Sequence, residues 1–75
     1  MSIHAEIGQN ILALRKEKNM TQEFLALEAE MSVSYLRSIE HGEANPSMET
    51  LSRIANALNE PFGRVVATRE HHEEP

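Results

Sequence analysis

The stretch TQEFLALEAEMSVSYLRSIEHG, residues 21–42, decides the fold of this 75-residue chain. It contains two segments with helical spacing of apolar residues, 22–29 and 33–40, separated by only a few residues. Thr21 and Ser32 stand directly before these segments, and hydroxyl side chains are suited to capping the first turn of a helix. Because a helix of about two turns is not stable alone in water, each must bury its apolar face against other helices. The stretch therefore predicts two short packed helices joined by a tight turn.

Helical spacing continues on both sides of this pair. The stripe that precedes it recurs at intervals of four, four and three residues: Ile3, Ile7, Ile11 and Leu14. It predicts a helix over 3–18. Ser47 is placed to cap a fourth helix that ends at Asn59, and Pro61 opens a short fifth helix through Val66. No segment alternates with a period of two, so the chain is predicted to be all-α with five helices.

Length and composition exclude several classes of protein. The chain is long enough for one small domain, and the absence of cysteine excludes disulfides and thiolate metal sites. Adjacent His71 and His72, beside Glu73 and Glu74, lack the fixed geometry of a metal site, so none is expected. The apolar runs are too short for a membrane span or a signal peptide, which favours a cytoplasmic protein with no membrane partner. So small a chain has few residues left to line a pocket, and no catalytic arrangement of side chains is evident in the sequence. We therefore expect neither an enzyme nor a cofactor.

The net charge of −5 argues at first against nucleic acid as a partner. Its distribution along the chain is uneven. Residues 1–20 carry a net charge of +1, whereas residues 21–50 carry −5, with Arg37 as the one basic residue among six glutamates. Electrostatic attraction to DNA is therefore expected to be modest.

Five groups of positions carry the clearest pattern: Ile7-Gly8 with Ile11 and Leu14-Arg15; Thr21-Gln22-Glu23-Phe24-Leu25-Ala26; Met31-Ser32-Val33-Ser34-Tyr35-Leu36; Ile39-Glu40-His41-Gly42; and Asn45-Pro46-Ser47 with Leu51. In residue type and spacing they resemble the lambda-repressor-like (Xre/Cro) helix-turn-helix family of transcriptional regulators. The resemblance covers residues 3–66 and implies a compact five-helix DNA-binding domain with its helix-turn-helix at helices two and three. It leaves residues 67–75, a charged segment without an apolar anchor, as a predicted disordered tail. The family implies a homodimeric, sequence-specific regulator that binds a double-stranded DNA operator.

The helix over 33–40 is the one that the resemblance assigns to the major groove. Its first turn carries small and polar residues, which let a helix N-terminus enter a groove ~12 Å wide. Arg37 lies on the same helical face as Val33 and Ser34, and arginine can form two hydrogen bonds to a guanine edge. The resemblance implies that base contacts come from four residues: Val33, Ser34, Arg37 and Ser38.

Contacts to DNA phosphates are implied for residues around this helix: Gln22, Ser32, Tyr35, His41 and Asn45. Plain N-capping is the competing role for Ser32, as it is for Thr21. Gln22, like Arg37, has no evident structural role in the sequence, which favours a functional one. Arg15 and Glu40 match a family ion pair that fixes the recognition helix, and we interpret them as scaffold.

Three positions depart from the family pattern. Glu30 stands where the turn usually has glycine, so it must adopt a positive φ or deform the turn, at a cost of ~1 kcal/mol. Leu12 replaces a residue that is commonly basic, which weakens the phosphate contact expected there. Phe24 and Leu27 occupy helix positions that are usually polar. They are interpreted either as extra packing against the first helix or the tail, or as a patch that binds a protein partner.

Dimerisation is expected through the C-terminal helices, because one recognition helix makes too few base contacts for useful specificity. Four residues are assigned to this region: Leu58, Phe62, Val65 and Val66. Phe62 and Val65 are expected mainly to close the core of the monomer, while Val66 and the end of the fourth helix near Leu58 line the two-fold interface.

Alternative functions share this fold. Two of them keep the DNA step: a restriction–modification controller protein and the DNA-binding antitoxin of a toxin–antitoxin pair. The third is a protein-interaction module that does not bind DNA, using its acidic surface and the patch formed by Phe24 and Leu27. The net charge favours this third reading, whereas Gln22, Arg37 and Asn45 favour DNA.

Overall fold

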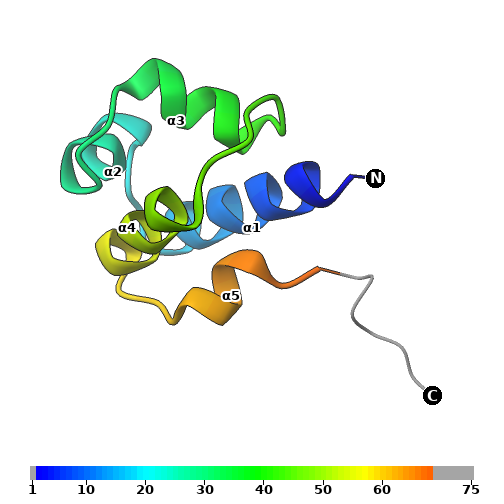
Figure 1. Cartoon of the computed structure of the whole chain (residues 1–75). Coiled ribbons are helices and arrows are strands. Elements are labelled where there is room, and N and C mark those ends of the chain that lie inside the picture. Colours follow the sequence, from blue (N-terminus) through cyan, green and yellow to red (C-terminus); the bar gives the residue numbers. More distant parts are fainter. Residues whose placement is uncertain (1, 69–75) are drawn as a thin grey trace.

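The computed structural model describes residues 2–68, which form five α-helices. They are α1 (Ile3–Glu17), α2 (Gln22–Glu28), α3 (Val33–Glu40), α4 (Met48–Leu58) and α5 (Phe62–Val66) (Figure 1). No strand occurs within this part of the chain, and the predicted all-α, five-helix class is confirmed. The boundaries differ from the predicted ones by one residue at three places. Lys18 and Ala29 are the C-caps of α1 and α2, and Pro61 is the N-cap of α5.

Hydroxyl side chains begin the first four helices. The side-chain oxygens of Ser2, Thr21, Ser32 and Ser47 each accept a hydrogen bond from the backbone N–H three residues later, at 3.0–3.1 Å. Each bond satisfies one of the donors that a helix N-terminus leaves without an intrahelical acceptor. The three predicted caps, Thr21, Ser32 and Ser47, are therefore present, and Ser2 is a fourth that was not predicted from the sequence.

A residue with a left-handed backbone ends each of the same four helices. The four φ angles are 58° at Asn19, 61° at Glu30, 75° at Gly42 and 59° at Asn59. The residue after each one donates its N–H to a carbonyl five residues back, as Met31 does to Ala26 at 2.9 Å. This pattern closes the last turn of each helix. Of the two alternatives stated for Glu30, the positive φ is the one observed, at a position where glycine carries no steric penalty.

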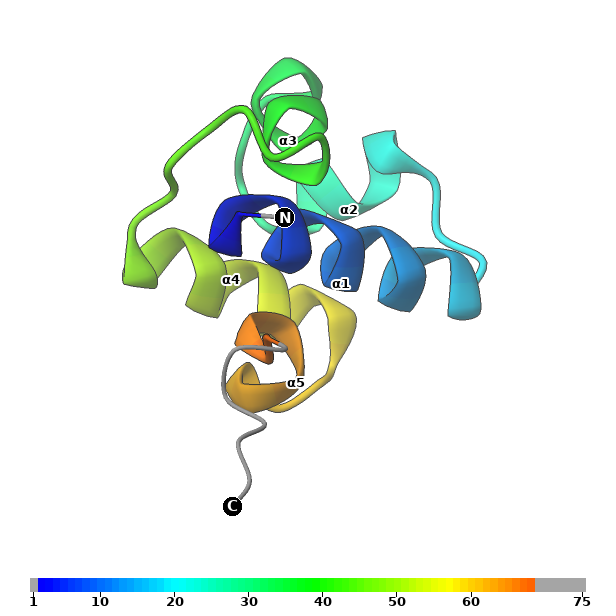
Figure 2. The same cartoon turned by 90° about the vertical axis from the view of Figure 1, so that its right-hand side faces the viewer.

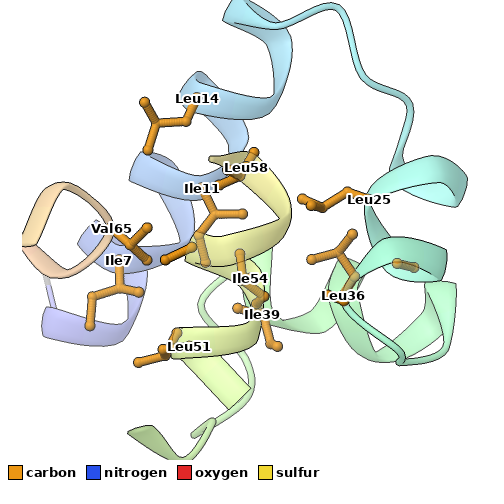
Figure 3. Packing of buried hydrophobic residues seen from close by; sticks show 13 residues of the cluster. Ile7, Ile11, Leu14, Leu25, Leu36, Ile39, Leu51, Ile54, Leu58 and Val65 are labelled. Carbon is orange, nitrogen blue, oxygen red and sulfur yellow. The ribbon is translucent and has the colours of Figure 1, made fainter. Parts of the chain in front are cut away.

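The first helix lies in the middle of the fold. It contacts α3, α4 and α5, while α2 contacts α3 and α4. In both views α3 lies at one end of the molecule and α5 at the other, with α1 between them (Figures 1 and 2). The apolar residues that these helices share form one core (Figure 3): Ile7, Ile11, Leu14, Leu25, Leu36, Ile39, Leu51, Ile54, Leu58 and Val65 among others. One face of α3 therefore packs on α1 and α2, and its opposite face has no neighbouring helix within the described residues (Figures 1 and 2).

Two glycines bring α1 unusually close to the end of α3. A Cβ atom added at Gly8 would lie 2.4 Å from the carbonyl oxygen of Ile39 and 2.6 Å from that of Glu40. A Cβ added at Gly42 would lie 2.8 Å from the Cα of Ala5. Both obstacles are backbone atoms, which cannot rotate away as a side chain can. Gly8 therefore sets the distance between α1 and the last turn of α3.

An ion-pair cluster ties the loop after α1 to the start of α5. The carboxylate of Glu60 lies 3.0 Å from Nζ of Lys18 and 3.1 Å from a guanidinium nitrogen of Arg64. The hydrogen bond from Lys18 is the main cause that holds the pKa of Glu60 below its usual value. Because this pKa is lowered in the folded state, the contacts contribute stability above the ordinary glutamate pKa. That contribution is lost as the pH falls through the lowered value.

The chain stays against α1 for two residues beyond the predicted end of the domain. The side-chain amide of Asn10 donates hydrogen bonds to the carbonyl oxygens of Val65, at 2.9 Å, and Ala67, at 2.7 Å. Thr68 is buried. The rest of the predicted tail, residues 69–75, lies outside the described residues.

Two predicted absences concern metals and membranes. The histidine pair considered as a metal site, His71 and His72, lies outside the described residues. Within them, no group of three or more metal-ligating side chains occurs, and none of the five helices is long and apolar enough to cross a membrane.

We predict that Gly8→Ala lowers the free energy of unfolding by about 1–3 kcal/mol, because the new methyl group must displace the backbone of α3. Urea denaturation followed by circular dichroism measures the change. Gly63→Ala is the matched control, since nothing lies within 4 Å of a Cβ added there and alanine favours the helix. A Gly8→Ala variant as stable as the Gly63→Ala variant would contradict the proposed close contact.

Candidate nucleic-acid interface

The surface at the upper end of the molecule is formed by α3 and the segments beside it (Figures 1 and 2). Leu36 and Ile39 point into the core, as their complete burial requires. On the other faces of α3, Ser34 and Arg37 are exposed, and Ser38 is half-buried. Val33 is half-buried and packs against the edge of the core, so only part of its side chain is available to a ligand. Each of the four residues predicted to read bases thus keeps some accessible surface.

Arg37 differs from most other basic residues of the chain. Among the lysine and arginine side chains of residues 2–68, only Arg37 and Lys16 take part in no ion pair or hydrogen bond. Arg37 is exposed on α3, so its guanidinium is available to an external acceptor. The first turn of α3 contains no acidic residue that would oppose such an acceptor.

Beneath this surface the ion pair predicted between Arg15 and Glu40 is present and buried. Arg15 Nε lies 2.7 Å from one carboxylate oxygen of Glu40, and a second guanidinium nitrogen lies 3.0 Å from the other. The third nitrogen of Arg15 donates to the carbonyl oxygen of Met20 at 2.9 Å. The side chains are only 9% and 2% exposed. An arginine fork on a carboxylate is a strong geometry, and here it joins α1 to the last turn of α3.

Gln22 also belongs to this cluster, which the sequence did not indicate. Its side-chain amide donates a hydrogen bond of 2.9 Å to Glu40 Oε1. The interpretation that Gln22 lacks a structural role is therefore wrong. The amide is half-buried at the start of α2, and one N–H and the carbonyl oxygen remain after this bond. Gln22 can thus be held by Glu40 and still meet a ligand.

The other residues predicted to contact phosphates lie along or beside α3. Ser32, the N-cap of α3, Tyr35 within it and His41, its C-cap, are all exposed. Asn45 lies in the loop between α3 and α4 and is also exposed. In Figure 2, the start of α2 and this loop are on opposite sides of α3. The predicted phosphate contacts are thus distributed around the helix predicted to enter the groove.

One further residue joins this surface from a distant part of the sequence. His4, in the first turn of α1, forms a hydrogen bond of 3.0 Å between its Nε2 and Oδ1 of Asn45. The two residues are 41 positions apart, and no local pattern links them. Sequence reasoning therefore missed His4.

The apolar residues on α2 remain exposed in the described part of the chain. Phe24 is 48% exposed and Leu27 is 72% exposed. The expected packing against α1 is therefore wrong, because packed side chains would lose most of this surface, whereas packing against the tail concerns residues 69–75, outside the described residues. What remains is an exposed apolar pair on a helix whose charged residues, Glu23 and Glu28, are acidic.

The residues assigned to a dimer interface divide differently from the prediction. Leu58 and Val65 are fully buried in the core. The expectation for Val65 is therefore confirmed, but Leu58 cannot line an interface, because its side chain has no surface to offer. Phe62 and Val66 are half-buried and pack at the margin of the core. They are the members of the set that retain accessible apolar surface.

We predict that Arg15→Met lowers the free energy of unfolding by about 3–5 kcal/mol, because it leaves the Glu40 carboxylate buried without its charged partner. An exposed pair would contribute only ~0–1 kcal/mol, so Glu49→Gln, which breaks the exposed contact with Arg53 at 3.7 Å, is the control. Urea denaturation measures both.

The double variant Arg15→Met/Glu40→Leu tests whether the unpaired carboxylate causes the loss of stability. It should recover part of the lost stability, since no unpaired charge remains buried. Recovery of none of it would mean that lost packing, rather than the unpaired carboxylate, accounts for the effect.

Comparison with known proteins places these features in context. A helix-turn-helix family profile matches residues 11–65. The chain is 45% identical over 60 residues to an immunity repressor protein of Bacillus phage phi105, an alignment that covers 80% of this chain and 42% of that protein. This chain therefore spans less than half of the phage repressor.

Two solved structures share the fold over most of their length. The restriction-modification controller protein C.AhdI from Aeromonas hydrophila is 29% identical, with a TM-score of 0.81, covering 83% of this chain and 94% of that one. The structure of C.Esp1396I bound to a 25 base pair operator site is 26% identical, with a TM-score of 0.79, covering 88% of this chain and 91% of that one.

Proposed function

Because this chain belongs to the helix-turn-helix family of transcriptional regulators, we propose that it binds a double-stranded DNA operator as a homodimer and reads base edges in the major groove with α3. The observation that carries this proposal is the exposed, unpaired guanidinium of Arg37 on α3. Arginine is the side chain best suited to a bidentate contact with guanine. The similar protein C.Esp1396I has been solved with an operator bound, which supports the same mode of action here.

In this proposal the surface residues divide into two sets. Four of them read bases: Val33, Ser34, Arg37 and Ser38. Five contact phosphates: Gln22, Ser32, Tyr35, His41 and Asn45. Base contacts provide specificity, and phosphate contacts fix the position of the protein on the duplex. Only part of Val33 is accessible, so its contribution is an apolar contact from the outer part of the side chain.

The negative net charge does not oppose this function at the surface concerned. Arg15 neutralises Glu40, the acidic residue within α3, and Arg37 remains as the unpaired charge of that helix. The residues of α3 therefore contribute one unpaired positive charge, whereas the whole chain has a net charge of −5. Non-specific attraction stays weak, so the affinity for an operator depends strongly on the base contacts.

Homodimerisation completes the proposed function. Two α3 helices must reach half-sites about one helical turn of DNA apart. The α5 helix lies at the opposite end of the molecule from α3 (Figure 2). Pairing through α5 leaves both recognition helices accessible, and the two-fold axis must also turn them toward the same face of the duplex. The apolar surface that Phe62 and Val66 retain is the observation that supports α5 as the interface.

A controller protein is the favoured type of regulator. The chain covers 94% of C.AhdI and 91% of C.Esp1396I, whereas it spans 42% of the phage repressor. The similarity to two restriction–modification controller proteins supports this type of regulator.

A protein-interaction role is the second candidate function. The exposure of Phe24 and Leu27 beside Glu23 and Glu28 favours it. Such a surface fits a protein partner that carries apolar and basic side chains. A salt titration with mixed-sequence DNA separates the two functions, because binding to phosphates weakens steeply as the salt concentration rises.

We predict that Arg37→Ala weakens operator binding by about 1–3 kcal/mol and removes the preference at one base pair. Its melting temperature should change little, because the side chain forms no hydrogen bond or ion pair within residues 2–68. The operator is first obtained by sequencing DNA fragments selected by the purified protein. Fluorescence anisotropy then compares it with duplexes that carry single base changes.

Arg64→Ala is the matched control for this variant. It also removes one arginine charge, from a side chain on α5 that is 56% exposed, but far from α3. If both variants lose affinity equally on every sequence, Arg37 contributes only charge and the proposed base contact is wrong.

For the dimer, we predict that Val66→Asp gives a folded monomer with weakened operator binding, because a charged group cannot remain in an apolar interface. Sedimentation equilibrium measures the mass, and circular dichroism confirms folding. Asn56→Asp adds the same charge on the exposed surface of α4 and should remain dimeric. Val66→Ala serves as a milder variant. Dimerisation of Val66→Asp at the wild-type strength would exclude this interface.

A further inference from the structure

The hydrogen bond between His4 and Asn45 connects two surface residues that the core does not constrain. Both side chains are exposed. One belongs to the first turn of α1 and the other to the loop that leaves α3. Neither residue is needed to close a helix end, because Ser2 caps α1 and Gly42 ends α3. The contact therefore has no evident structural role within the monomer.

The geometry of this contact determines which side of the Asn45 amide is presented to solvent. The Oδ1 atom can only accept, so Nε2 of His4 carries the hydrogen in this bond. With its oxygen occupied, Asn45 presents its NH₂ group, which can only donate. A free asparagine could turn its amide by half a rotation and present the oxygen instead. A phosphate group offers acceptors, so only the first orientation is productive.

The position of Asn45 in the fold agrees with donation from its NH₂ group to a DNA phosphate. The loop that contains it lies on one side of α3, and the start of α2 lies on the other (Figure 2). On the α2 side, the amide of Gln22 is held by Glu40 at 2.9 Å. Each flank of α3 therefore carries a side-chain amide held by a second side chain. A groove occupied by α3 has phosphates along both of its edges.

We propose that His4 is a positioning residue that holds the Asn45 amide with its NH₂ group toward a DNA phosphate, an inference that rests on the proposed function. His4 acts through Asn45 and does not itself read a base. The first turn of α1 adds the positive end of a helix dipole beside the same phosphate. The bond is formed before DNA arrives, so binding does not have to order the Asn45 side chain.

The experiment measures the affinity of the full chain for a mixed-sequence duplex of about three helical turns, at low salt, by fluorescence anisotropy. Four proteins form a double-mutant cycle: wild type, His4→Phe, Asn45→Ala and the double variant. Phenylalanine keeps an aromatic ring but cannot donate the hydrogen bond. Asn56→Ala, at an exposed position on α4, is the control for loss of an amide elsewhere. Thermal unfolding is recorded for each protein.

We expect His4→Phe and Asn45→Ala each to weaken DNA binding about three- to tenfold, the range for one lost hydrogen bond. The double variant should be no weaker than Asn45→Ala alone, because His4 has nothing left to orient. His4→Gln should bind DNA more tightly than His4→Phe and nearly as tightly as wild type, since the glutamine amide can donate to Oδ1 of Asn45. Melting temperatures should stay within the range of the Asn56→Ala control, which a purely structural role for His4 would not predict.

Three results would overturn the inference: wild-type affinity in His4→Phe, additive losses in the double variant, or no recovery in His4→Gln. Additive losses would mean that His4 contacts the DNA independently of Asn45. Failure of the proposed function looks different, because wild type itself would then bind no duplex at low salt.

Discussion

The buried ion pair between Arg15 and Glu40 is the interaction on which the other features of the candidate site depend. Removing two charges from water is costly unless hydrogen bonds replace those lost to solvent. Here Arg15 makes two bonds to Glu40 and one to the Met20 carbonyl, and Gln22 adds a third bond to the same carboxylate. One cluster thus connects α1, the loop that follows it, α2 and the end of α3.

The close contact at Gly8 acts together with this ion pair. The glycine allows the backbone of α1 to approach the carbonyls of Ile39 and Glu40, which places Glu40 within reach of Arg15. Leu36 and Ile39 fill the core on the same side. Orientation of α3 is therefore fixed by packing, close backbone contact and charge at once. As a consequence, Arg37 and Ser34 face outward on a helix that has little freedom to rotate.

The helices and their ends could be predicted from the sequence because their causes are local. Ser32 caps the helix that begins one residue later, and Gly42 ends the same helix through its own φ. The spacing of Ile7, Ile11 and Leu14 indicated the buried face of α1. The partners of the ion pair came from the family resemblance, since 25 residues separate Arg15 from Glu40 and no periodicity relates them. Four residues could be proposed for base readout, but how much of each side chain is accessible could not be predicted.

By itself, the sequence determined the all-α class, the order of the five helices and the caps Thr21, Ser32 and Ser47, because each depends on neighbours within one or two turns. Only the tertiary structure decided which apolar residues remain exposed. Phe24 and Leu27 have the character of core residues but face solvent, whereas Leu58, assigned to an interface, is enclosed. The tertiary structure also brought Gln22 to Glu40 and His4 to Asn45. These outcomes depend on how whole helices pack, and a long-range contact leaves no spacing in the sequence from which it could be inferred.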